Sequence, residues 1–275
     1  MPLTFLAALA VTVWSTAPAG GPTLAVEDTM HTEVAPVLVH APRVTLSEIL
    51  DRVARGEARR DSLMQDQTFL FTTRFVRGTA EKNAAPMLLF ETVSRVYRKR
   101  PDKSRTQVLR DYRAFPKKKG SGGIKVSMGP GMNEDIVNFA FQPSSRRDFR
   151  YHILGRDLAG NHLIYRLGFE PRSLLDPGAP HGTVWIDTND FVIVRQEVGF
   201  AHSPAPPLLK SVDRMIIERE NVNGYWVLRR VLMRAQLGVP LPKFGRSFDM
   251  SLQFDQYAIN TGLPDSLFVR SGAPN

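Results

Sequence analysis

The sequence contains no cysteine. This absence excludes disulfide bonds, thiolate catalysis and zinc sites built on cysteine. It also argues against a lipid anchor of the bacterial lipoprotein kind, because that anchor is attached to a cysteine just after the signal peptide. The fold must then be stabilised by a packed core, and 275 residues are enough to bury one in one domain or at most two.

Long apolar runs are also scarce. The clearest one, residues 3–14, is followed by small residues, Pro18 and Gly20, which is the layout of a secretory signal peptide. Later segments are too short to cross a membrane, which takes roughly 20 apolar residues. We therefore expect residues 1–25 to be a signal peptide, with cleavage after either Ala19 or Ala25. The exported chain would be soluble in the periplasm, with a flexible leader over residues 26–44.

Motifs of catalysis and of metal binding are missing as well. The six histidines lack the HExxH or i,i+4 spacing of a metal site, and there is no G-x-S-x-G elbow or G-K-[ST] phosphate loop. Asp187, Asn189 and Asp190 resemble a calcium loop, but Asp and Asn also stabilise plain hairpin turns, which we favour here. We expect no enzyme, no cofactor and no metal, and keep a hydrolase with an unrecognised site as the alternative from the enzyme class.

Positive charge is in excess, with a formal net charge of +9 and a pI near 10. Such a balance predicts affinity for anionic surfaces such as phospholipid headgroups. We do not expect a nucleic-acid partner, because no base-stacking motif accompanies the charge. Lys117, Lys118 and Lys119 could contact headgroups, although a solvated loop is the simpler explanation for them.

One helix is indicated near residue 45. Thr45 and Glu48 have the spacing of a capping box, and apolar residues from Leu46 to Val53 recur at helical spacing. This pattern predicts a helix over residues 45–58, and the charged residues 55–61 are expected on its solvent side.

From Thr68 onward the period changes to two, which is typical of strands with one buried face. Turn residues at 157–160, 188–190 and 221–224 predict three hairpins, and residues 246–258 alternate most sharply. About ten strands after one helix predict a mainly β fold with helices (α+β), built on a large curved antiparallel sheet.

The concave side of such a sheet has to be filled by a helix, a ligand or both. Methionine and phenylalanine on that face would adapt to an irregular apolar ligand. An ordinary core is the competing explanation, because any half-buried sheet produces the same stripe. The candidate lining residues are Phe69, Phe71, Leu163, Tyr165, Leu167, Val192, Val194, Met215, Ile217, Met233, Phe248, Met250, Leu252 and Phe254.

Four segments, in this order along the chain, resemble the outer-membrane lipoprotein-sorting proteins of the LolA-like superfamily. They are YRL at residues 165–167, GTVWID at 182–187, VIVRQE at 192–197 and NGYWV at 223–227. The resemblance implies a half-open antiparallel barrel covered by helices over residues 45–260, with an apolar cavity for acyl chains and a C-terminal tail at 261–275.

The same resemblance implies a periplasmic carrier that binds acyl chains of lipoproteins or lipids and moves them toward the outer membrane. Its partners would be an inner-membrane export complex and an outer-membrane acceptor, with transient contact with the membrane surface. The acceptor role itself would need a cysteine, which this chain lacks. The alternative is an envelope-stress sensor that uses the same domain to bind lipid and a membrane regulatory protein.

Overall fold

The computed structural model describes residues 44–78, 86–115, 139–160, 162–173, 179–241 and 245–269. They belong to one compact unit, Arg43–Asn275. The expected signal peptide, nearly all of the expected leader, Lys117 to Lys119 and the last residues of the expected tail lie outside the described residues. None of the helices in the described ranges is both long enough and apolar enough to cross a membrane.

Helix α1 (Leu46–Leu63) begins where the capping box predicted. The Thr45 hydroxyl oxygen accepts a hydrogen bond from the backbone N–H of Glu48 at 3.2 Å, which satisfies one of the free donors of the first turn. The helix continues five residues beyond the predicted end at residue 58. The expectation that residues 55–61 face solvent is wrong for Glu57 and Arg60, because both are buried in ion pairs against the sheet.

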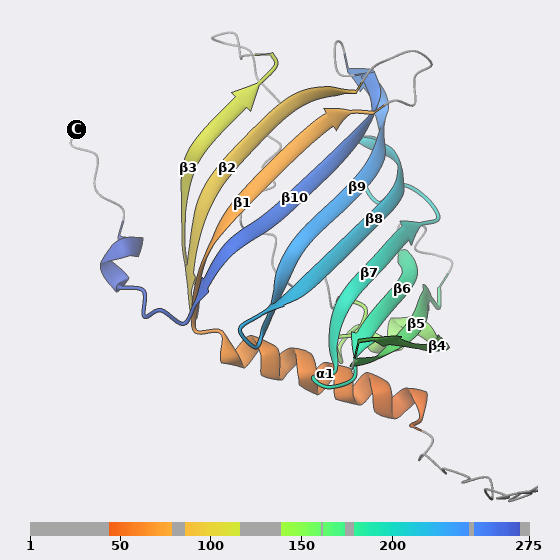
Figure 1. The fold of residues 1–275 in the computed structure, drawn as a ribbon. Coiled ribbons are helices and arrows are strands. Elements are labelled where there is room, and N and C mark those ends of the chain that lie inside the picture. The colour runs from red at the N-terminus through yellow and green to blue at the C-terminus, as the bar shows by residue number, and fades with distance from the viewer. Residues whose placement is uncertain are drawn as a thin grey trace, which may run out of the picture. The chain divides into compact units, whose positions relative to one another are not determined.

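Ten antiparallel strands form one sheet in the order β3-β2-β1-β10-β9-β8-β7-β6-β5-β4 (Figure 1). Their bounds are β1 (Asp66–Arg77), β2 (Met87–Lys99), β3 (Lys103–Arg113), β4 (Phe149–Ala159), β5 (His162–Pro171), β6 (Pro180–Asp187), β7 (Val192–Phe200), β8 (Leu209–Val222), β9 (Tyr225–Leu241) and β10 (Gly245–Ile259). Two short 3-10 helices, η1 (Arg146–Asp148) and η2 (Asp265–Phe268), flank the strands. Pairing of β1 with β10 joins two meanders into a single sheet.

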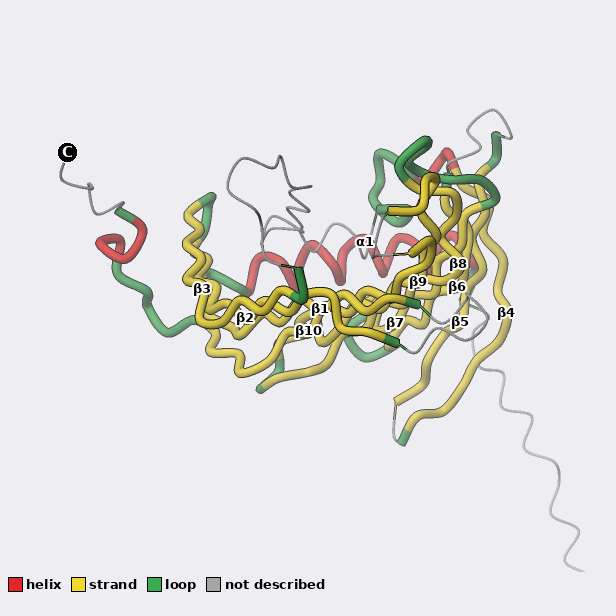
Figure 2. The backbone as a smooth tube through the Cα atoms, turned by 90° about the horizontal axis from the view of Figure 1, so that it is seen from above, coloured by secondary structure: helices red, strands yellow, loops and turns green. Residues whose placement is uncertain are grey.

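The predicted large curved antiparallel sheet is confirmed, and it stays open because β3 and β4 are its two edge strands. Figure 2 shows these strands at opposite ends, with α1 running along one face, which we call the concave face. Strand register places Leu252 of β10 beside Val231 of β9, and Val231 beside Ile217 of β8, on this face. These side chains and Ile49 and Val53 of α1 form one hydrophobic core cluster.

The expectation of several helices covering the sheet is wrong for the part of the chain that the structure describes, where α1 is the only α-helix. The β4–β5 end is covered by a turn as well. Phe141 is almost completely buried, with its ring centroid 5.3 Å from that of Tyr151 and 5.9 Å from that of Phe169. Aromatic side chains of this turn therefore cover the β4–β5 end of the sheet, as a second helix was expected to do.

Candidate functional site on the concave face

Most of the predicted lining residues do share the concave face and its core. Eight belong to the hydrophobic core cluster and three more pack against it, whereas three lie outside it. The eight are Phe69, Phe71, Tyr165, Leu167, Ile217, Met250, Leu252 and Phe254. The three that pack against the cluster are Met215, Met233 and Phe248, and the three outside are Leu163, Val192 and Val194.

A β-bulge in β7 explains two of the three outliers. Trp185 pairs with Arg195 while Ile186 pairs with Ile193, so Val194 is an extra residue in β7 with no partner of its own on β6. The bulge changes which side chains of β7 join the hydrophobic core cluster: Ile193 belongs to it, whereas Val194 and the buried Val192 do not. The third outlier, Leu163, is 36% exposed near the start of β5.

The most adaptable part of the concave face is a row of methionine and phenylalanine side chains. Register aligns Met215, Met233 and Met250 across β8, β9 and β10, and aligns Met250 with Phe75 of β1. Phe75 stacks on Phe90 of β2 and on Phe248 of β10, with ring centroids 4.3 and 5.5 Å apart. We call Phe75, Phe90, Met215, Met233, Phe248 and Met250 the Met–Phe row.

The Met–Phe row extends beyond the strands that α1 chiefly contacts, which are β4, β7 and β9. Its outer members, Met215, Met233, Phe90 and Phe248, are only partly buried. Thioether and aromatic side chains of this kind can repack around an apolar group at low cost. The row is therefore the part of the concave face whose side chains can repack most readily.

Gln196 of β7 is a polar residue on this apolar face that was not among the predicted lining residues. It pairs with Ile217 and Val184, is completely buried, and neither atom of its amide group has a hydrogen-bond partner in the described part of the chain. An unpaired buried polar group costs about 1–3 kcal/mol. Simple alternation from Val192 and Val194 also places Gln196 on this face, and the β7 bulge leaves it there.

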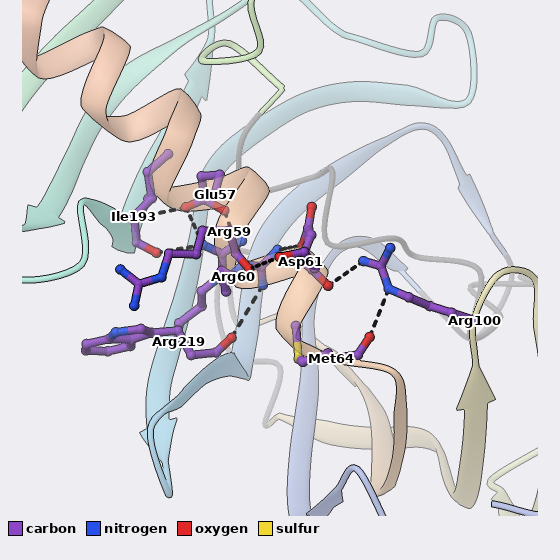
Figure 3. A network of polar contacts seen from close by, with 10 residues as sticks. Glu57, Arg59, Arg60, Asp61, Met64, Arg100, Ile193 and Arg219 are labelled. Carbon is purple, nitrogen blue, oxygen red and sulfur yellow. Dashed lines mark hydrogen bonds and ion pairs between the residues drawn. The ribbon is translucent and has the colours of Figure 1, made fainter. Parts of the chain in front are cut away.

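Buried charges fix α1 to the sheet (Figure 3). The Glu57 carboxylate accepts hydrogen bonds from the Arg219 guanidinium at 2.7 Å and from the Ile193 backbone N–H at 2.9 Å. Arg60 lies 3.3 Å from the other Glu57 oxygen, and Arg219 also donates to the Ile193 carbonyl at 3.0 Å. We call Glu57, Arg60 and Arg219 the helix–sheet ion cluster.

The electrostatics of this cluster favour the charged forms despite burial. Burial alone would raise the pKa of Glu57, but Arg219, Arg60 and the two hydrogen bonds hold that pKa below its ordinary value. Burial and the neighbouring Arg219 lower the pKa of Arg60 to about 10, still far above neutral pH. The cluster therefore stays ionised under ordinary conditions and holds α1 against β7 and β8.

Arg100 secures the other end of the helix. Its guanidinium donates to the backbone carbonyls of Met64 at 2.8 Å and Asp61 at 2.5 Å (Figure 3). A cation at a helix C-terminus satisfies carbonyls that have no partner within the helix. Together, the helix–sheet ion cluster and Arg100 hold α1 in place along the concave face.

The possible calcium loop forms a hairpin turn. The Asp187 carboxylate accepts hydrogen bonds from the backbone N–H groups of Asn189 at 2.8 Å and Asp190 at 3.3 Å, and lies 2.6 Å from His162. These bonds are those of an Asx turn. Within the described ranges, no group of three or more acidic or histidine side chains could hold a metal ion.

Comparison with known proteins finds that this chain is similar to several solved structures. A DUF1329 family protein from Desulfovibrio piger has 15% identity and a TM-score of 0.39, over 82% of this chain and 97% of that one. A domain of an outer membrane lipoprotein-sorting protein from Vibrio parahaemolyticus has 12% identity and a TM-score of 0.34, over 80% and 97%. A LolA superfamily protein from Nitrosomonas europaea has 14% identity and a TM-score of 0.32, over 82% and 98%.

No protein-family model and no curated protein matches this chain. Two of these three structures carry the lipoprotein-sorting or LolA description. At such identities and TM-scores no residue of those proteins can be matched to one here. The chemistry of the concave face has to follow from its own side chains.

Proposed function

We propose that this protein is an exported periplasmic carrier that holds an acyl chain of a lipoprotein or lipid on its concave face and catalyses no reaction. The Met–Phe row carries the proposal. It is apolar, it is built from adaptable side chains, and its outer members are only partly buried. The signal-peptide pattern of residues 1–25 supports export, and transfer toward the outer membrane follows as the role of such a carrier.

Burial of methylene groups would supply the affinity. Each buried methylene contributes about 0.8 kcal/mol, so about ten of them give roughly 8 kcal/mol before the cost of ordering the chain. That cost leaves binding reversible, as a carrier needs. Gln196 adds a polar group at the same face whose unpaired amide could bond an ester or amide carbonyl of the cargo.

The position of Gln196 also favours a ligand that combines apolar and polar parts. Val184 and Ile217 flank it on the two neighbouring strands, so a hydrocarbon alone would leave the amide unpaired. A lipid or an acylated protein carries carbonyl groups at the head of each chain. The concave face thus fits an acyl ester or acyl amide better than a plain hydrocarbon.

A binding assay with a fluorescent fatty acid tests the proposal. Met215→Gln combined with Met233→Gln keeps side-chain volume but places amides in the Met–Phe row, and it should weaken binding at least about tenfold, because two desolvated amides cost more than 1.4 kcal/mol. The matched control is Leu232→Gln, on the opposite face of β9, where Leu232 pairs with Ile216 and Ser251.

The control variant should bind the probe as the unaltered protein does. Circular dichroism melting of the unaltered protein, the double variant and the control tests whether the two variants are folded. Equal affinity of the double variant and the unaltered protein would exclude the Met–Phe row as the acyl site.

A further inference from the structure

A cavity lies away from the Met–Phe row, between the N-terminal half of α1 and the start of β4. Its volume is about 620 Å³. Four arginines and two leucines dominate its wall: Arg146, Arg147, Arg150, Arg172, Leu46 and Leu50. The cavity wall thus combines positive charge with apolar surface.

Two of the four arginines are held in place by the protein itself. Arg146 forms an ion pair with Asp51 and donates to the Ser47 hydroxyl at 3.3 Å and to the Ser47 carbonyl at 3.4 Å. Arg172 donates through Nε to the Phe149 carbonyl at 2.9 Å. Both guanidinium groups are therefore fixed at the rim of the cavity.

The other two arginines, Arg147 and Arg150, are exposed and have no ion pair or side-chain hydrogen bond to any residue that the structure describes. Asp51 already neutralises Arg146, and the other two carboxylates nearby are Asp148 and Glu170, which lies opposite Arg150 on β5, so the four arginines outnumber the three carboxylates. The cavity rim is left with an excess of positive charge. Guanidinium groups bind carboxylate and phosphate in two-pronged geometry, which makes an anion the natural complement.

The floor of the cavity is apolar. Leu50 is only 5% exposed and belongs to the hydrophobic core cluster, and Leu46 packs against that cluster. Tyr151 lies between the two zones: its hydroxyl donates to the Ala140 carbonyl, and burial raises its pKa to about 12, so it stays neutral. The cavity thus has a cationic rim above a floor that is continuous with the core.

We propose that this cavity binds the anionic head of an amphiphile, a phosphate or carboxylate, with Arg147 and Arg150 as the binding residues. Arg146 and Arg172 complete the positive rim, and the first part of the apolar chain covers Leu46 and Leu50. The inference deepens the proposed carrier function and rests on it for the chain. It narrows the cargo to acidic lipids or to acyl groups beside a phosphate or carboxylate.

Isothermal titration calorimetry on the mature chain tests the assignment, with three probes used below their micelle concentrations. Dodecyl phosphate supplies the anion and the chain, inorganic phosphate the anion alone, and dodecyl maltoside the chain alone. Arg147→Gln with Arg150→Gln removes two charges at the rim. Arg55→Gln with Arg59→Gln removes two charges from exposed positions on α1 that do not line the cavity, and is the matched control.

The expected result is tight binding of dodecyl phosphate, weakened about tenfold or more by the rim variant and changed less than about twofold by the control. Inorganic phosphate should bind much more weakly than dodecyl phosphate. Equal losses in the rim and control variants would overturn the proposal, since they would show a general charge effect. Inorganic phosphate binding as tightly as dodecyl phosphate would also overturn it, because the cavity would then be a site for a free anion.

The two proposals fail in different ways. If the carrier function is wrong, neither dodecyl phosphate nor dodecyl maltoside binds better than inorganic phosphate. If only the headgroup inference is wrong, both amphiphiles bind, and the rim variant binds dodecyl phosphate as tightly as the unaltered protein does.

Discussion

Glu57→Gln should be the most damaging conservative substitution in α1. The substitution preserves shape but removes the negative charge that faces two buried guanidinium groups, those of Arg60 and Arg219. The side chain of Arg219 is completely buried, so water cannot solvate its charge when the Glu57 carboxylate is removed. Removing one partner of a buried ion pair costs about 3–5 kcal/mol, and we expect a loss of that size in the free energy of unfolding.

Urea denaturation followed by circular dichroism measures the effect. The control is Glu48→Gln on the same helix, which breaks an ion pair with Arg52 whose side chains are 42% and 39% exposed. Exposed i,i+4 pairs contribute about 0.3–0.5 kcal/mol, so the control should barely move the urea midpoint. Equal effects of the two substitutions would refute the assignment of the helix–sheet ion cluster as the main polar anchor of α1.

A triple substitution separates charge from packing. Glu57→Met with Arg60→Met and Arg219→Met removes all three charges of the helix–sheet ion cluster and keeps apolar volume in the same place. Replacing a complete buried ion pair or triad by apolar residues is often neutral or stabilising. The triple variant should therefore recover most of the stability lost in Glu57→Gln, and a loss equal to that of the single variant would show that geometry, not the loss of the Glu57 charge, was responsible.

Three further predictions concern stability. The pKa of Glu57 is lower in the folded protein than its ordinary value of 4.5, so its contribution to the free energy of unfolding is complete above pH 4.5 and declines as the pH falls through the folded-state pKa. Urea midpoints measured as a function of pH should show this decline, and Glu57→Gln should remove it. Thr45→Ala removes the N-cap of α1 and should lower the free energy of unfolding, measured in urea, by about 0.5–2 kcal/mol. Ser62→Ala on the same helix is the control and should leave the free energy of unfolding unchanged. Gly182→Ala would place a Cβ 1.9 Å from the Glu197 carbonyl oxygen, so thermal melting should show a loss of stability of about 1–3 kcal/mol. Gly155→Ala is the control and should lose less stability, because its Cβ would meet only the end of the Arg166 side chain, at 3.1 Å.

Local sequence signals predicted the parts of the fold that depend on local chemistry. The capping box set the start of α1, and Asn223-Gly224 formed the turn between β8 and β9, where both residues have positive φ. The sharp alternation of residues 246–258 correctly predicted β10, which runs from Gly245 to Ile259. In each case the residue type itself prefers the observed backbone.

The parts that sequence reasoning missed depend on contacts between distant segments. Glu57 and Arg60 looked like solvent-facing charges, because the partner that buries them, Arg219, lies on β8 far along the chain. The β7 bulge at Val194 leaves no mark in the amino-acid pattern, yet it decides that Ile193 and not Val192 joins the hydrophobic core cluster. The cationic cavity likewise assembles residues of α1, η1, β4 and the end of β5 that no spacing rule connects.

We expect the concave face to hold an acyl chain in the cell. Native mass spectrometry of the protein purified from its own envelope under mild conditions tests this expectation. The spectrum should show a lipid or acylated ligand bound at about one per protein, lost in Met215→Gln with Met233→Gln and retained in Leu232→Gln. A fully ligand-free protein that also fails to take up an acyl chain from added lipid would contradict it.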